Sequence, residues 1–321
     1  MPGIRLDGAR RTPSRPGRKG LIAVNRQRGT GRGRVIAPAA LFAVVVVLWD
    51  LANTQGWVSD LILPRPWDVV VATYELFSTG IVWEHLLATF YETLAGFAAA
   101  AVLGIGTALA AGSSRLVRQM VYPYAVTLQV LPMLSIAPIL ISAFGFGYTS
   151  KIVIAGMIAF FPVFVNALTG LLAPDPDAEE LFRSLRAGKK RTFLSLLLPT
   201  AAPMIFAGLR IGLTLALAGA VVAEIVSAQK GLGFLVQRYS SQLNQDDAFA
   251  VVLVLTAMGL LLYAAIGLAD RTIVFWRHAG RSTSKTRSRE RSVRRRLGET
   301  PARPAESAAS NPSASQEEKV S

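Results

Sequence analysis

The stretch APDPDAEELFRSLRAGKKRTFLSLLLPTAAPMI, residues 173–205, is a long polar interruption between apolar segments that carries strong helix signals. Asp175 followed by Pro176 is typical of a helix N-cap and a first helical position, where the missing N–H of proline costs nothing. Acidic residues in the next turn complement the helix dipole. One apolar stripe then follows at helical spacing, made of Leu181, Phe182 and Leu185.

The end of this helix is predicted at Gly188, since glycine commonly terminates helices, and three basic residues follow it. A second short helix is predicted over 193–198, running into Pro199. The stretch would therefore be a cationic helix-turn-helix between two membrane spans. Its apolar stripe either packs under those spans or faces water and needs a partner.

Composition places the chain among membrane proteins. The 321 residues are 52% hydrophobic, with a mean hydropathy of +0.42, which is high for a soluble protein. The net charge of +14 is concentrated at the two ends and in the central loop. Basic ends could suggest nucleic acid, but arginines flanking apolar spans follow the positive-inside rule, so no nucleic-acid partner is expected.

Several kinds of chemistry are excluded by residue content. The chain has no cysteine, which excludes disulfides and thiolate sites, and its two histidines are far apart. The Gly-x-x-x-x-Gly-Lys-Ser/Thr phosphate loop and a nucleophile–base–acid constellation are both missing from the sequence. We therefore expect no metal, no cofactor and no catalysis by this chain, and an energy source in a partner.

Six apolar segments predict an all-α membrane protein with six transmembrane helices. Loop charges agree with both termini lying inside and the segment 53–85 lying outside. The predicted third span is interrupted by Pro132 and Pro138, and 113–119 is predicted to be a tight inner turn. The predicted spans are 35–52, 86–112, 120–144, 151–173, 203–227 and 248–276.

The domain organisation follows from these segments. Arg-, Gly- and Pro-rich residues 1–34 and the Arg-rich, then polar, residues 277–321 are predicted to be disordered cytoplasmic tails. Residues 35–86 hold the first span and an external segment. A signal peptide is the alternative for the first span, but that span ends in Trp49-Asp50, so an uncleaved helix is favoured. The transmembrane core covers 87–276, with the polar loop at 174–200.

The chain resembles the membrane subunit of type I ABC importers, in the branch that takes up nitrate, sulfonates and taurine. The family's cytoplasmic signature, Glu-Ala-Ala, three residues, Gly, nine residues, Ile, one residue, Leu-Pro, aligns its glutamate with Glu180 and its isoleucine with Leu196. Two departures are Leu181-Phe182 in place of the alanines and Arg186 in place of the glycine. Further matches are Ala207-Gly208-Leu209-Arg210, Gly219-Ala220-Val221-Val222-Ala223-Glu224 and Lys230-Gly231-Leu232-Gly233.

The resemblance implies a type I importer transmembrane fold with several partners. These are cytoplasmic ABC ATPase subunits, a second copy of the chain or a homologous permease, an extracytoplasmic solute-binding protein and the lipid bilayer. It also implies that the central loop docks into a groove on the ATPase. The coupling residues would be Glu180, Leu181, Phe182, Leu185, Arg186 and Gly188. For Glu180, dipole stabilisation and an interface contact are compatible interpretations.

Candidates for the translocation path or a gate come from polar residues and prolines within the spans. On the third span they are Gln129, Pro132, Ser135 and Pro138, where prolines either free carbonyls for a cavity or only kink the helix. The helix of the fifth span is expected to begin in the cytoplasm near Phe193, so Arg210 either reaches the inner interface or contacts substrate. Glu224 is a candidate for an outer gate or a binding-protein contact. Glu92 is expected to be solvated at the outer end of its span.

Other functional classes remain as alternatives. A stand-alone secondary transporter or channel would require paired intramembrane charges or internal repeats, and no repeat is visible in the sequence. A membrane anchor using basic tails is a third class. Within the favoured class the substrate stays open among nitrate, sulfonates, taurine and vitamin precursors.

Overall fold

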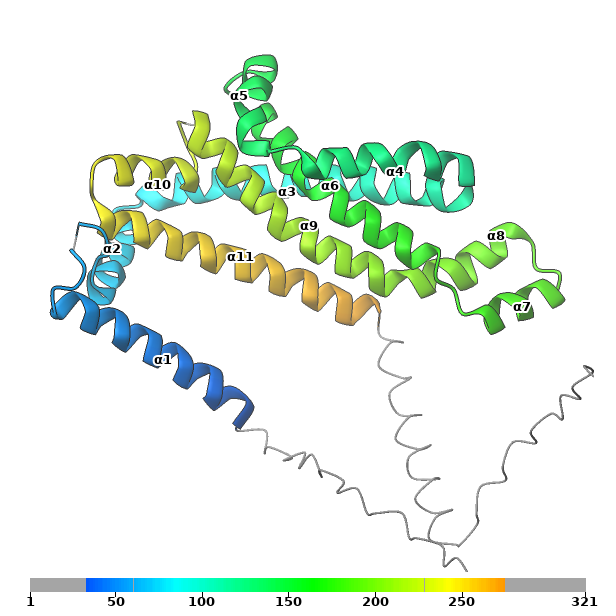
Figure 1. Ribbon diagram of the computed structural model, residues 1–321, viewed down its shortest axis with the longest axis horizontal. Helices are drawn as coiled ribbons and strands as arrows, with labels where there is room; N and C mark the ends of the chain where they lie inside the picture. Colours follow the sequence, from blue (N-terminus) through cyan, green and yellow to red (C-terminus); the bar gives the residue numbers. More distant parts are fainter. Residues whose placement is uncertain (1–32, 60, 228, 275–321) are drawn as a thin grey trace, which may run out of the picture. The chain divides into compact units, whose positions relative to one another are not determined.

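The computed structural model describes residues 33–59, 61–227 and 229–274, and the regular elements within these ranges are helices (Figure 1). The predicted tails, 1–34 and 277–321, lie outside the described residues except for Gly33 and Arg34. The described chain divides into two compact units, with the boundary between Trp57 and Val58.

The first unit contains a single long helix, α1 (Gly33–Thr54). It is apolar and long enough to cross a membrane, and most of its large hydrophobic side chains are not covered by other parts of the chain. This agrees with the span predicted at 35–52.

The second unit contains the remaining helices, and Figure 1 shows α2 and α10 at one end of it and α7 and α8 at the other. The helices are α2 (Pro66–Ser78), α3 (Ile81–Ser113), α4 (Arg115–Val130), α5 (Met133–Phe144), α6 (Tyr148–Leu171), α7 (Pro176–Ser184), α8 (Lys189–Thr192), a π-helical turn (Phe193–Leu197), α9 (Leu198–Ser227), α10 (Leu232–Ser241) and α11 (Gln245–Ile273).

Helices α3, α6 and α9 form the core of this unit through small residues. The buried alanines at their contact are Ala100, Ala155, Ala159, Ala216 and Ala220. A β-carbon added at Gly96 of α3 would lie 2.7 Å from the Ala155 β-carbon of α6. Because lipid provides no hydrophobic force between helices, such close backbone approach supplies the van der Waals contact that holds them together.

Five of the described helical segments are long and apolar enough to span a membrane, and the bent pair α4–α5 makes a sixth if counted as one span. The two helices of that pair meet at 108° next to Pro132, which confirms the predicted break there. Pro138 lies inside α5 and does not interrupt it. The predicted turn over 113–119 is wrong, since Ser114 alone separates α3 from α4 and caps α4 through the Val117 N–H.

The separate short helix predicted over 193–198 is wrong, because residues Lys189–Ser227 form one continuous helical segment. This continuity agrees with the expectation that the helix of the fifth span begins near Phe193. Proline in a helix clashes with the carbonyl four residues earlier and lacks an N–H. Here the π-helical turn widens the backbone just before Pro199, with the Leu198 N–H donating to the Phe193 carbonyl five residues back. The Thr200 hydroxyl donates to the Leu196 carbonyl at 2.7 Å.

Candidate functional site

The polar loop over 174–200, called the coupling loop below, begins with a well-capped α7. The Asp175 carboxylate accepts a hydrogen bond from the Asp177 N–H at 3.1 Å, as its sequence predicted. Pro176 occupies the first turn, and Asp177 and Glu179 lie at the positive end of the helix dipole. The helix therefore forms for local reasons, with no residue of α7 buried in the rest of the chain.

The end of α7 differs from the prediction. The helix stops at Ser184, and Arg186 has a φ of 51°, in the left-handed region that favours glycine. The Arg186 N–H donates to the Arg183 carbonyl and the Ala187 N–H to the Phe182 carbonyl, both at 3.0 Å. These two bonds make a Schellman motif, which satisfies carbonyls that the helix end would otherwise leave open.

Gly188, the predicted helix terminator, is instead extended, with φ −63° and ψ 153°, and is the N-cap of α8. A β-carbon at this position would meet open space. The prediction failed because it treated arginine as unable to adopt the left-handed conformation at a helix end. That conformation costs about 1–2 kcal/mol for a residue with a side chain, and the two capping hydrogen bonds offset this cost.

The apolar stripe of α7 splits into two directions. Leu181 and Leu185, one turn apart, are 56% and 68% exposed, so they do not pack under the spans. Phe182 is partly buried and faces a pocket beneath the helix. Glu180 and Arg186 are exposed. The chain thus presents a pair of leucines to water, with charged residues beside it.

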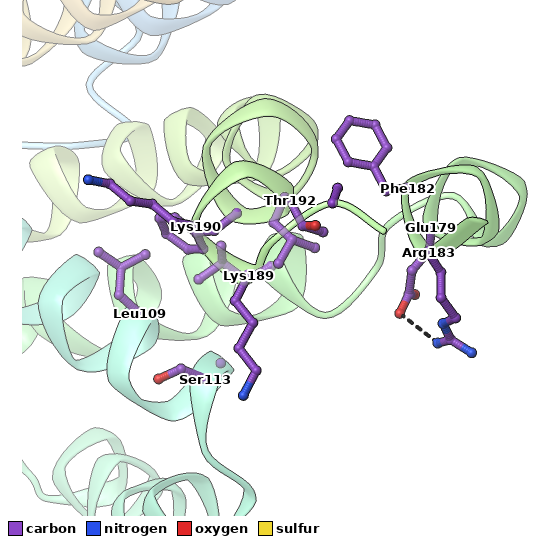
Figure 2. A pocket seen from close by; sticks show the side chains of 13 residues that line it. Leu109, Ser113, Glu179, Phe182, Arg183, Lys189, Lys190 and Thr192 are labelled. Atoms are coloured by element: carbon purple, nitrogen blue, oxygen red, sulfur yellow. Dashed lines mark ion pairs between the residues drawn. The ribbon is translucent and has the colours of Figure 1, made fainter. Parts of the chain in front are cut away.

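The pocket beneath α7 has a volume of about 590 Å³ and lies between the coupling loop and the ends of α3 and α6 (Figure 2). Its apolar wall comprises Leu109, Leu171, Phe182, Phe193 and Leu197. Lys189 and Lys190 stand at its rim, and Figure 2 shows Lys189 extending toward the Ser113 end of α3. Glu179 and Arg183 of α7 also line the pocket, and the Arg183 guanidinium lies 3.5 Å from the Glu179 carboxylate.

At the opposite end of the unit, Glu224 holds a glycine turn in place. Its carboxylate accepts hydrogen bonds from the Thr89 hydroxyl and the Gly233 N–H, both at 2.6 Å. Thr89 in turn accepts the Leu232 N–H at 2.8 Å. We call Thr89, Glu224 and the turn 230–233 the outer clamp, after the side of the membrane on which the loop charges predict it to lie; it joins α3, α9 and α10.

The glycines of this turn are required by the clamp. Gly231 has a φ of 123°, and a β-carbon there would lie 2.2 Å from the Glu224 carboxyl. Its N–H donates to His85 Nδ1 at 3.0 Å. The neighbouring Lys230 is exposed and pairs with Glu84, whose hydrogen bond raises the pKa of the lysine.

Glu92, which was expected to be solvated, is fully buried and pairs with Lys151 at 2.8 Å. The expectation was wrong because it weighed each ionisable residue alone. Two residues of opposite charge at the predicted outer ends of the second and fourth spans were the signal that could have found the pair.

The other path candidates lie in separate places. Arg210 of α9 pairs with Asp270 of α11 at 3.1 Å, and its guanidinium lies 5.2 Å from the Tyr263 ring centre. Asp270 is a partner that the sequence analysis did not identify. The α4–α5 candidates are all exposed: Gln129, Pro132 and Ser135 lie around the bend, and Pro138 lies inside α5. None of the four belongs to the hydrogen-bonded contacts of Arg210 or Glu224 described above.

Comparison with known proteins identifies the family to which the chain belongs. Residues 100–274, more than half of the chain, match the model of the binding-protein-dependent transport system inner membrane component. The formylaminopyrimidine transport permease protein ThiX of Halalkalibacterium halodurans is 33% identical over 245 residues, which cover 76% of this chain and 97% of that protein. The putative aliphatic sulfonates transport permease SsuC of Bacillus subtilis is 31% identical, covering 80% and 93%.

Solved structures agree on the fold. A chain of an amino acid ABC transporter crystal structure superposes with a TM-score of 0.54 at 16% identity, covering 62% of this chain and 97% of that one. Permeases named for taurine and nitrate transport are further relatives. With its apolar helices and a water-facing helical loop, the chain belongs to the binding-protein-dependent inner membrane components and is a multi-pass permease subunit of a type I ABC importer.

Proposed function

We propose that α7 docks into a groove of a separate cytoplasmic ATPase subunit and passes its movements to α9. The exposed pair of Leu181 and Leu185 supports docking, since apolar residues one turn apart are the usual anchors of a helix in a groove. The unbroken segment Lys189–Ser227 supports transmission, because a force on the coupling loop would act directly on a core helix.

The remaining coupling residues would have distinct roles. Glu180, exposed beside the leucines, would make a polar contact at the edge of the interface. Phe182 would fix α7 over the pocket, and Arg186 and Gly188 would set the direction of the chain into α8.

The docking proposal is tested by co-purification of the chain with its ATPase subunit. Replacing both leucines, Leu181→Ala with Leu185→Ala, should weaken the complex by about tenfold or more per leucine, from the apolar surface no longer buried. The matched control is Glu179→Ala with Arg183→Ala, two truncations on the opposite face of α7. If both double variants lost the co-purifying ATPase subunit to the same extent, docking through the leucines would be contradicted.

ATP hydrolysis is assigned to that partner, since the sequence lacks a phosphate loop. The purified chain should show no ATP hydrolysis, and the assembled complex should. Hydrolysis by the purified chain alone would overturn this assignment.

The translocation path would form between this chain and a second copy or a homologous permease. The exposed bend holding Gln129, Pro132, Ser135 and Pro138 is the candidate lining. The Arg210–Asp270 pair and the outer clamp at Glu224 are candidates for groups that rearrange during transport.

The solute is proposed to be small and delivered by an extracytoplasmic binding protein. Relatives named for sulfonates, taurine and nitrate favour a small anion, and those named for formylaminopyrimidine and riboflavin favour a vitamin precursor. The deciding experiment is ATP-dependent uptake by the reconstituted complex with its binding protein, using solutes of both kinds. Uptake by this chain alone, driven by a proton gradient, would instead indicate a secondary transporter.

A further inference from the structure

The pocket beneath α7 combines an apolar wall with a charged rim. Its wall is apolar, formed by the last turns of two membrane spans and by the start of the segment leading to α9. Its polar lining comprises the lysines of α8, the Ser113 hydroxyl and the Glu179–Arg183 ion pair, so the two lysines leave it with a net positive charge (Figure 2). A cationic rim over an apolar wall at the end of membrane spans is complementary to an anionic amphiphile.

We propose that this pocket binds an anionic phospholipid of the cytoplasmic leaflet. The phosphate would lie between Lys189 and Ser113, and the start of an acyl chain would cover Leu109 and Leu171. The assignment rests on the proposed function in one respect, namely that α7 and α8 lie on the cytoplasmic side, where anionic lipids attract basic segments.

The apolar wall distinguishes a lipid from a free anion. Inorganic phosphate would use the rim alone and leave the leucines and Phe193 exposed to water. A volume of about 590 Å³ admits a headgroup together with the first part of a chain. The rim lysines are exposed and are not engaged by any ion pair of the described residues.

A bound lipid would also account for how α7 is held. No residue of α7 is buried by the rest of the chain, yet Phe182 and the turn residue Ala187 both line the pocket. A lipid between them and α3 would fill the space under the coupling helix and hold it in a defined position against the membrane. Lipid composition would then influence how well the ATPase is coupled.

The test uses the full chain assembled with its ATPase, purified in detergent. Native mass spectrometry follows titration with phosphatidylglycerol and with phosphatidylcholine of the same acyl chains. We expect phosphatidylglycerol to bind more tightly to the wild type. Lys189→Gln should weaken its binding by about fivefold, and Lys189→Gln with Lys190→Gln by about 25-fold, without changing phosphatidylcholine binding.

Arg191→Gln is the matched control, since it removes the same charge from the same turn but the residue does not line the pocket. It should change phosphatidylglycerol binding by less than about twofold, as expected for a screened charge outside the site. Gly112→Leu, which projects into the pocket, should reduce lipid binding while leaving the lysines in place. Millimolar inorganic phosphate should not displace the lipid.

The outcomes separate this proposal from the docking proposal. Equal phosphatidylglycerol binding by the wild type and the lysine variants, or full displacement by phosphate, overturns the lipid site. The same preparations are assayed for ATP hydrolysis. A complex that hydrolyses ATP but shows no lipid preference contradicts the lipid site alone, and a chain that binds the lipid but captures no ATPase contradicts docking alone.

Discussion

Arg186 holds a backbone conformation that glycine adopts without steric cost. The surrounding turn nevertheless forms, because two backbone hydrogen bonds close it and the arginine side chain is free to extend into solvent. The importer signature has glycine at this position. The chain therefore keeps the backbone of the signature while departing from its residue, and the strain is stored at one position of the coupling loop.

Replacing that arginine should relieve the strain. Arg186→Gly is expected to stabilise the folded chain by about 0.5–1 kcal/mol, the left-handed penalty less the extra backbone entropy of glycine. Gly188→Ala should be close to neutral, since its φ is −63° and its β-carbon meets open space. Thermal unfolding of both variants in detergent measures the difference. If Gly188→Ala lowered the thermal stability more than Arg186→Gly did, α7 would have to end elsewhere.

A second prediction for individual residues concerns the glycines of the outer clamp. Gly231→Ala and Gly233→Ala should each destabilise the chain by roughly 1–3 kcal/mol. At Gly231 the new β-carbon meets the Glu224 side chain at 2.2 Å, whereas at Gly233 it meets the Val221 backbone carbonyl at 2.7 Å. At Gly233 the Glu224 carboxylate oxygen also lies 2.9 Å from the new β-carbon, so adding Glu224→Ala should recover more of the loss at Gly231 than at Gly233, where the contact with the backbone carbonyl remains. Thermal unfolding of the four variants completes the comparison, and equal recovery at both positions would contradict the clamp geometry.

Among the elements, α3 shows how close helix contact depends on particular glycines. Gly96 faces α6 with no room for a β-carbon, while Gly106 on the same helix has open space. We expect Gly96→Ala to lower thermal stability by about 1–3 kcal/mol because α3 and α6 must separate. Gly106→Ala should be neutral or stabilising by up to about 1 kcal/mol, from helix propensity. Similar unfolding temperatures for the two variants would show that α3 and α6 do not meet at Gly96.

For the whole molecule, the sequence predicted the spans and the polar loop but not the contacts between them. Hydropathy and the capping signals at Asp175 are local properties, so they could be read directly from the residues. The Glu92–Lys151 pair and the outer clamp depend on which segments meet in space. The match of Glu224 and the glycine turn to family motifs indicated that both matter, without indicating that they bind each other.

The distribution of charged residues predicts the orientation of the molecule in the membrane. The coupling loop carries Arg183, Arg186 and Lys189 through Arg191, whereas the segment between the first two long helices is rich in acids. From the positive-inside rule we therefore predict that the coupling loop lies in the cytoplasm, together with both termini, and residue 59 outside. Because the chain has no cysteine, single substitutions report cleanly: Ser59→Cys and Ser184→Cys are both at exposed positions. In intact cells a membrane-impermeant maleimide should label Ser59→Cys strongly and Ser184→Cys only after permeabilisation. The reverse pattern would invert the topology and remove the coupling loop from reach of a cytoplasmic ATPase.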